Sequence, residues 1–426
     1  MVESSKISSA WMYTVLPISA LSAGLSILIP LYILFLKGTV YDVGVATAVY
    51  ALVEIPSSIF WGNLTDKIKK TKLFILLSII GVFPILLILY FISYVPVVYT
   101  VYGLYSFVAT ASSPAINILI MSKKKTRTLP KYFSRYSIIV IIGSLLGLIG
   151  GLLINYGMLK QYLLFLLAVN VTALLAAMFL IESDNLPEKI ENELAVKRSF
   201  SVLNMLSVTP HILTGHALLE RLHKGLRNHK RTDIYLLLLM IALFNLGLYL
   251  FNTSYIPYLY AYGVNYSGIF SINISNMIAQ LIIYTVVMSL VKRIRLGRYY
   301  KLSTITRSIS YVIAMIPAFI VTQLFLSVNI LAYFVAGIGY AMWNITSSVM
   351  LYERIKHTYP GHYIGLWVAI LGLSGVVGAF MSGIISSIDG YFATFVISIA
   401  AIILSLIVLI YMERLWNRRF GVELYE

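Results

Sequence analysis

The sequence predicts an all-α integral membrane protein with twelve transmembrane helices in two pseudo-symmetric bundles of six. Sixty per cent of the 426 residues are hydrophobic and only 11% are charged, and the mean hydropathy of +0.89 exceeds that of soluble globular domains. Apolar runs of about 20 residues, the length that crosses a bilayer, recur between clusters of charge. One long polar segment divides these runs into two groups of six.

The runs are predicted to be helices rather than strands of a membrane barrel. A run such as LFILLSIIGVFPILLILYFI (residues 73–92) is apolar on every face, whereas barrel strands alternate over about ten residues. The first run is longer than a signal-peptide core and has no persuasive cleavage site, so we interpret it as a retained span. The predicted spans are 8–36, 42–62, 73–94, 96–120, 135–157, 160–182, 232–262, 265–291, 302–324, 325–350, 362–388 and 389–412.

These spans define four parts of the chain. We expect an N-terminal bundle (1–182), a cytoplasmic linker (183–231), a C-terminal bundle (232–412) and a cytoplasmic tail (413–426). The end of the linker alternates leucines with basic residues, a pattern typical of an amphipathic surface helix.

The two halves also show signs of an internal duplication. A shift of 228 residues aligns the loop after span 2 with the loop after span 8, and places Gly147 and Gly150 on Gly375 and Gly378. The same shift therefore aligns both the loops and the glycines of spans 5 and 11, which favours a repeated unit of six helices.

The basic residues predict the orientation of the chain. The odd-numbered connections carry Lys37 and Lys160, and we assign the rest of the 32 Lys and Arg to the even-numbered connections and the termini. Both termini should therefore be cytoplasmic in a cell membrane, with membrane lipids rather than nucleic acid as counter-charges to the net +16. The chain has no cysteine and no nucleotide-binding or metal-ligand pattern, so we expect no cofactor and no metal.

One charged stretch carries a resemblance to a known family. Residues 62–70, GNLTDKIKK, follow span 2 and resemble the signature loop of the major facilitator superfamily, G-x-L-[A/S]-D-[R/K]-x-G-[R/K]-[R/K]. Lys69 replaces the second glycine of that pattern. The resemblance implies a transporter whose two six-helix bundles alternate access to a central site.

The same resemblance implies a conformational latch made of Gly62, Asp66, Lys67 and Lys70. We expect Gly62 to end a helix at a tight turn and Asp66 to pair with Lys70. In relatives the equivalent aspartate faces the start of helix 11, near Gly361 to Gly365 here, where the helix dipole favours an anion. The simpler alternative is a solvated basic loop that enforces topology.

Glu54 is the carboxylate that lies deepest in a predicted span. An ionised group at that depth costs several kcal/mol unless it meets water or a partner. Thr47, Tyr50, Glu54 and Ser57 share one helix face. Glu54 is therefore a candidate for proton coupling or for binding a cationic substrate, and the alternative is a neutral acid with a structural role.

Other polar residues recur at helical spacing and should face the interior, because an amide facing lipid would lack hydrogen bonds. Some will join helices, and others are candidates to line an uncharged, aromatic-rich cavity. The cavity-lining candidates are Tyr32, Tyr50, Asn117, Asn245, Tyr249, Asn252, Asn273, Asn276, Gln280, Tyr284, Tyr340 and Asn344.

A glycine series in span 5 bears on the direction of transport. Gly143, Gly147, Gly150 and Gly151 resemble the antiporter signature of drug-exporting relatives, but the proline that normally follows its second glycine is missing. Span 4 also lacks the intramembrane arginine of many such exporters. Close helix packing through small residues is the preferred interpretation.

Together these features predict a secondary active transporter rather than an enzyme. We favour efflux of small amphipathic or hydrophobic compounds by a monomer, with protons as the candidate coupling ion. One alternative is uptake of a small polar or sugar-like metabolite by uniport or symport. Another is a non-transporting scaffold or lipid-handling protein.

Overall fold

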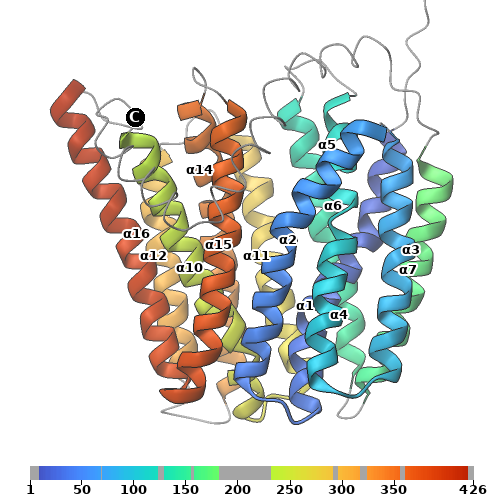
Figure 1. The fold of residues 1–426 in the computed structure, drawn as a ribbon. Helices are drawn as coiled ribbons and strands as arrows, with labels where there is room; N and C mark the ends of the chain where they lie inside the picture. Colours follow the sequence, from blue (N-terminus) through green and yellow to red (C-terminus); the bar gives the residue numbers. More distant parts are fainter. Residues whose placement is uncertain are drawn as a thin grey trace, which may run out of the picture.

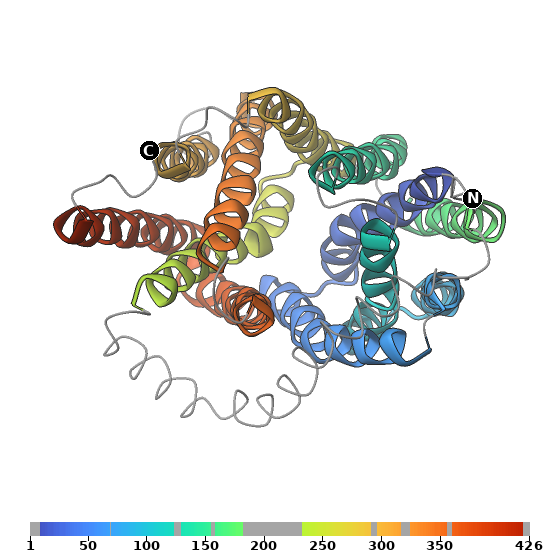
Figure 2. The ribbon, with the colours of Figure 1, turned by 90° about the horizontal axis from the view of Figure 1, so that it is seen from above.

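The computed structural model describes residues 9–68, 70–122, 129–154, 158–181, 232–290, 296–316, 324–355 and 360–420. The N-terminal bundle contains η1 (Ser9–Thr14), α1 (Val15–Phe35), α2 (Val40–Ile68), α3 (Thr71–Phe91), α4 (Val95–Ala109), α5 (Ser112–Ser122), α6 (Leu129–Gly150), η3 (Gly151–Leu153) and α7 (Leu159–Leu180). The C-terminal bundle contains α10 (Thr232–Ala261), α11 (Tyr266–Leu290), α12 (Leu296–Met315), α14 (Phe325–Ile355), α15 (Pro360–Ile388) and α16 (Gly390–Phe420). Seen from above, the two bundles lie side by side (Figure 2).

Eleven membrane-length apolar helices are found within the described residues, and α12 completes the predicted set of twelve spans. Its 20 residues include Arg298, Lys301 and Arg307, which lower its hydropathy. It packs along α14 and α16, inside the C-terminal bundle. The predicted linker and the predicted surface helix lie outside the described residues.

Local sequence sets the turn between α1 and α2. Lys37 adopts a positive φ of 63°, which ends α1, and Thr39 then begins the next helix. The Thr39 backbone N–H donates to Asp42 Oδ2 at 2.6 Å, and the Asp42 N–H donates to Thr39 Oγ1 at 3.4 Å. This reciprocal capping satisfies N–H groups that the first turn of α2 would leave unpaired.

One sequence prediction needs correction, and two other segments show detail that the sequence did not predict. Gly62 does not end a helix, because α2 continues to Ile68 and a Cβ at Gly62 would meet nothing within 4 Å. The predicted span 96–120 matches the membrane-length unit Val95–Leu119, but its helix is interrupted between α4 and α5, where Pro114 lacks the N–H that would bond back to Thr110. The predicted tail from 413 begins as helix, because α16 runs on to Phe420.

Each bundle packs its fifth span against its first through glycine. A Cβ added to Gly143 or Gly147 of α6 would collide with backbone atoms of α1, and one added to Gly378 of α15 would lie 2.9 Å from Leu246 O of α10. The pairs that the shift of 228 residues aligns do not make the same contacts, because Gly150 faces the Phe165 side chain of α7 whereas its counterpart Gly378 meets α10. Close helix packing at glycine is nevertheless common to both halves. This finding favours the packing interpretation of the span 5 glycines.

The bundles touch each other mainly through α2 with α15 and α6 with α11. We call the end of the molecule where α1 begins and α16 ends the terminal face, and the other end, with the α1–α2 turn, the opposite face. Near the opposite face a Cβ on Gly44 would lie 2.7 Å from Gly383 Cα, and the rings of Tyr162 and Phe270 pack edge to face at 5.0 Å.

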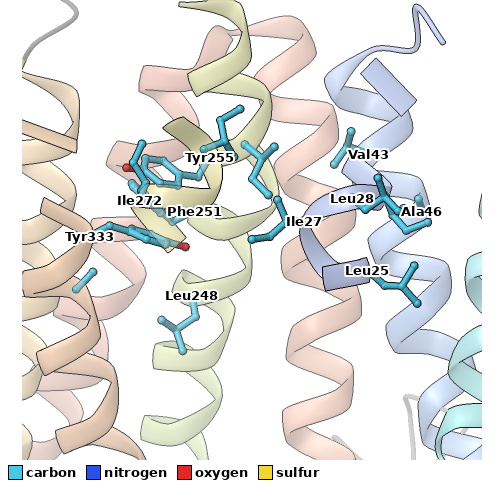
Figure 3. Close-up of a cluster of buried hydrophobic side chains, with 14 of the residues drawn as sticks. Leu25, Ile27, Leu28, Val43, Ala46, Leu248, Phe251, Tyr255, Ile272 and Tyr333 are labelled. Atoms are coloured by element: carbon cyan, nitrogen blue, oxygen red, sulfur yellow. The ribbon is translucent and has the colours of Figure 1, made fainter. Parts of the chain in front are cut away.

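Apolar side chains fill the space between the bundles beside these contacts. Ile27 of α1 belongs to the same buried apolar cluster as Phe251 and Tyr255 of α10 (Figure 3), and α1 contacts α10. At the terminal face, by contrast, the end of α2 stands apart from the start of α15 (Figure 1). The helix ends of the two bundles therefore meet near the opposite face, whereas the ends of α2 and α15 lie apart at the terminal face.

Candidate binding site between the bundles

Glu54 lies in the middle of α2, where this helix faces the C-terminal bundle. Its side chain is exposed, and tyrosines of both bundles lie within electrostatic range of it. The next residue, Ile55, lies against Gly372 of α15. Within the described residues, the Glu54 carboxylate has no ion-pair partner and no hydrogen bond. It is therefore available to a proton or to a ligand.

Tyrosines of the N-terminal bundle surround this carboxylate. The phenols of Tyr50, Tyr102 and Tyr105 are close enough to Glu54 to interact with its charge. The rings of Tyr50 and Tyr102 are 4.7 Å apart, and those of Tyr102 and Tyr105 stack at 6.1 Å. Ser106 Oγ donates to Tyr50 O at 2.9 Å, which fixes α4 against α2. These electron-rich ring faces suit a positively charged group.

The C-terminal bundle provides the facing wall. Tyr249 of α10 also lies within electrostatic range of Glu54, and it interacts in the same way with Tyr340 of α14. Tyr340 lies within electrostatic range of Tyr284 of α11. Its side chain is hydrogen-bonded to that of Asn344, one turn along the same helix. Residues from both bundles thus converge on one interior region.

Arg307 of α12 is a buried cation that was not among the predicted site residues. The charge distribution assigned it to the connections, although it falls inside the predicted span 302–324 and is only 2% exposed. Its Nε donates to Tyr311 Oη at 2.9 Å, one terminal nitrogen donates to Ala336 O at 2.6 Å, and the other donates to Asn252 Oδ1 at 3.3 Å. Its guanidinium also lies 4.9 Å from the Tyr311 ring centre.

Several predicted cavity residues join helices instead of lining the interior. Tyr32 is 1% exposed and donates to Ile92 O at 3.0 Å. Asn245 donates to Leu371 O at 2.8 Å and to Ser374 Oγ at 2.9 Å, which ties α10 to α15.

The amides of α11 are also used within the protein. Asn276 is buried and donates to Tyr333 O at 2.8 Å, and Gln280 donates to Asn276 Oδ1 at 2.7 Å. Asn273 bonds to Ile269 O of its own helix at 2.9 Å. Asn117 of α5 is exposed, and no contact places it with the groups around Glu54.

The predicted latch residues lie at the terminal face. Lys67 and Lys70 are exposed, and Lys70 has a non-helical backbone immediately before α3. The side chain of Asp66 and those of residues 361–365 lie outside the described part, so the latch stays a prediction.

Comparisons with known proteins agree with this architecture. The family model described as Major Facilitator Superfamily matches residues 13–366. No curated protein sequence matches significantly. The solved nucleoside transporter NupG aligns with a TM-score of 0.68 and 13% identity over 96% of this chain and 98% of that chain.

Two further structures give similar values. PepTSo2 aligns with a TM-score of 0.73 and 14% identity, over 96% of this chain and 98% of that chain. A POT family transporter solved with 5-aminolevulinic acid aligns with a TM-score of 0.72 and 13% identity, over 95% of this chain and 96% of that chain. At such identities the likeness establishes the fold, and the interior residues must be interpreted from this chain itself.

Proposed function

The chain belongs to the major facilitator superfamily, and on that premise we propose that it exports small amphipathic cations in exchange for protons. In this proposal the bundles rock about the interior region around Glu54, which opens to each side in turn. The observation that carries it is the placement of Glu54: an exposed carboxylate, free of partners in the described residues, among tyrosines of both bundles.

Exchange follows from the use of a single carboxylate. Glu54 can hold a proton or a cationic group but not both, so binding of one displaces the other. A transporter whose proton and cargo compete in this way moves them in opposite directions. An inward proton gradient would then drive the cargo out of the cell.

The charge distribution supports the orientation. With basic loops and termini on the cytoplasmic side of the cell membrane, the described state would be open inward, ready to load cargo from the cytoplasm. Closing the terminal face would bring Asp66 of α2 toward the first turn of α15, where an anion is stabilised by the helix dipole. We propose that this contact is the latch of the outward-open state and that a monomer suffices for the cycle.

The test uses proteoliposomes and the permanently charged trimethylphenylammonium ion, which cannot itself carry a proton. We expect an imposed pH gradient to drive its accumulation against the proton flow. Glu54→Gln should weaken its binding about tenfold and abolish the response to pH, because the ion pair between the quaternary ammonium and the carboxylate is lost. Glu413→Gln is the matched control, since Glu413 pairs with Lys301 at 2.6 Å away from the interior.

Three results would overturn the proposal. Undiminished pH-driven transport in Glu54→Gln would remove that residue from coupling. Accumulation of neutral sugar-like solutes along the proton flow would support uptake instead. If no class of compound stabilises the purified protein against heat or is transported across the proteoliposome membrane, a non-transporting scaffold or lipid-handling role would be supported.

A further inference from the structure

A second polar group faces the same interior from the C-terminal bundle. Asn252 of α10 is exposed, and its Oδ1 accepts two hydrogen bonds, from Arg307 at 3.3 Å and from Tyr333 Oη at 3.2 Å. Within the described residues its Nδ2 amino group has no acceptor. The amide is thus held by its oxygen and presents two N–H donors.

The orientation of this amide is chemically determined. Guanidinium has five N–H donors and no acceptor, so the atom of Asn252 that faces Arg307 must be the oxygen. A flipped amide would set two donors against each other. The amino group must therefore point away from Arg307, toward the exposed side.

Arg307 also gives the region a positive potential. Among the described residues no carboxylate lies within ion-pair distance of it, and its hydrogen-bond partners are the Tyr311 hydroxyl, the Ala336 carbonyl and the Asn252 amide oxygen. A charge buried at this depth is costly unless an opposite charge, polar groups or water compensate it. An anion placed at the Asn252 amino group would provide the missing compensation.

Tyr249 links the positions of Asn252 and Glu54 in the interior. Asn252 follows Tyr249 by one helical turn on the same face of α10, and Tyr249 lies within electrostatic range of Glu54. The N-terminal bundle therefore contributes a free acid, and the C-terminal bundle contributes free donors backed by a cation.

We propose that the cargo is a small zwitterion with an apolar body, whose cationic group lies at Glu54 and whose carboxylate is bound by Asn252. Asn252 is the contact residue, and Arg307 is a positioning residue that orients the amide and adds favourable potential. This inference rests on the proposed function and adds the second charged group of the cargo.

The test compares three probes that share a benzyl body and a protonated amine. Phenethylamine has no acceptor, phenylalaninamide adds a neutral carbonyl, and phenylalanine adds a carboxylate. Affinities for the full-length protein would be measured by ligand-dependent thermal stabilisation at about pH 6. Phenylalanine should bind roughly tenfold more tightly than phenylalaninamide, with phenethylamine weakest.

Variants then assign the preference to its residues. Asn252→Asp replaces the donors with an oxygen and pairs with Arg307, so the carboxylate preference should vanish while phenethylamine binding persists. Arg307→Gln should reduce the preference, and Arg307→Lys should retain more of it by keeping the charge. Asn265→Asp is the control, because Asn265 Oδ1 accepts from the Gly268 N–H at 2.9 Å, a role that aspartate also fulfils.

The outcomes separate this inference from the function on which it rests. The proposal of a zwitterionic cargo would be overturned by any of three results. These are equal affinity for phenylalanine and phenethylamine, a carboxylate preference that survives in Asn252→Asp, and no binding of any probe. If the preference is absent while amine binding still requires Glu54, the inference fails and the cation exporter stands. If the preference requires Asn252 but amine binding is unaffected by Glu54→Gln, the cation site fails instead.

Discussion

The contact between Gly44 and Gly383 offers a direct test of how the bundles move. A Cβ on Gly44 would lie 2.7 Å from Gly383 Cα, whereas ordinary contacts begin at 3.4 Å, so α2 and α15 must separate by 0.7 Å (3.4 minus 2.7). The obstructing atoms are backbone and cannot swing away. Overpacking of this kind costs about 1–3 kcal/mol. Because the clash exists only when the opposite face is closed, Gly44→Ala should shift the equilibrium toward the state open there by about 5- to 150-fold.

The shift can be measured by cysteine labelling, because the chain has no cysteine of its own. Ile27 is 3% exposed between the bundles, so Ile27→Cys should react with an impermeant maleimide mainly when the opposite face opens. We expect Gly44→Ala to raise this rate. Gly247→Ala is the control, since its Cβ would lie 2.8 Å from Ser398 O within the C-terminal bundle. It should lower the melting temperature without changing the labelling rate. An unchanged rate in Gly44→Ala, or an equal rise in Gly247→Ala, would refute the reasoning.

Three further predictions follow from the same contacts. Gly383→Ala should raise the Ile27→Cys labelling rate by less than Gly44→Ala, because its Cβ would lie 3.0 Å from Gly44 Cα; a larger rise would contradict this ranking. Asn245→Ala removes the amide that joins α10 to α15 and should cost about 0.6–1.7 kcal/mol of stability in a melting experiment. Loss of transport at unchanged stability would argue for a binding role instead. Asp66→Asn should weaken the proposed latch and slow the labelling of Ile27→Cys, and a wild-type rate would remove Asp66 from the latch.

The membrane architecture could be predicted because hydrocarbon imposes one length and one polarity on every span. The break between α4 and α5 was missed although Pro114 gives a signal for it, because an apolar run looks continuous whether or not its helix bends. The end of α2 was misplaced for a different reason. Gly62 resembles a helix stop in the family pattern, but the residues that follow it have adequate helix propensity, and the helix runs on to Ile68.

The interior was only partly predictable. Glu54 could be predicted because an acid within an apolar run is costly. Arg307 was not predicted, because the charge distribution assigned the basic residues to the connections and the termini. Asn245 and Asn252 share a helix face, yet Asn245 packs against α15 while Asn252 is exposed. Seven residues correspond to about 10 Å along a helix, far enough to pass from a packed zone to an open one. The spacing of residues predicts which face of a helix they share. Whether a side chain is buried, and which group it bonds to, depends on the neighbouring helices.

The distribution of charge between the bundles suggests how cargo could drive the transport cycle. A ligand shifts a conformational equilibrium only by its difference in affinity for the two states. A molecule that touched one bundle would move with it and would favour neither state. If the cargo binds Glu54 on one bundle and Asn252 on the other, both contacts form together only when the bundles approach at the depth of the site. Such a cargo would stabilise the closed intermediate more strongly than a cation that reaches only Glu54 and the tyrosines beside it. Trimethylphenylammonium should therefore exchange slowly in the same vesicles in which a zwitterion exchanges fast. Equal exchange rates at saturation would mean that bridging does not drive closure.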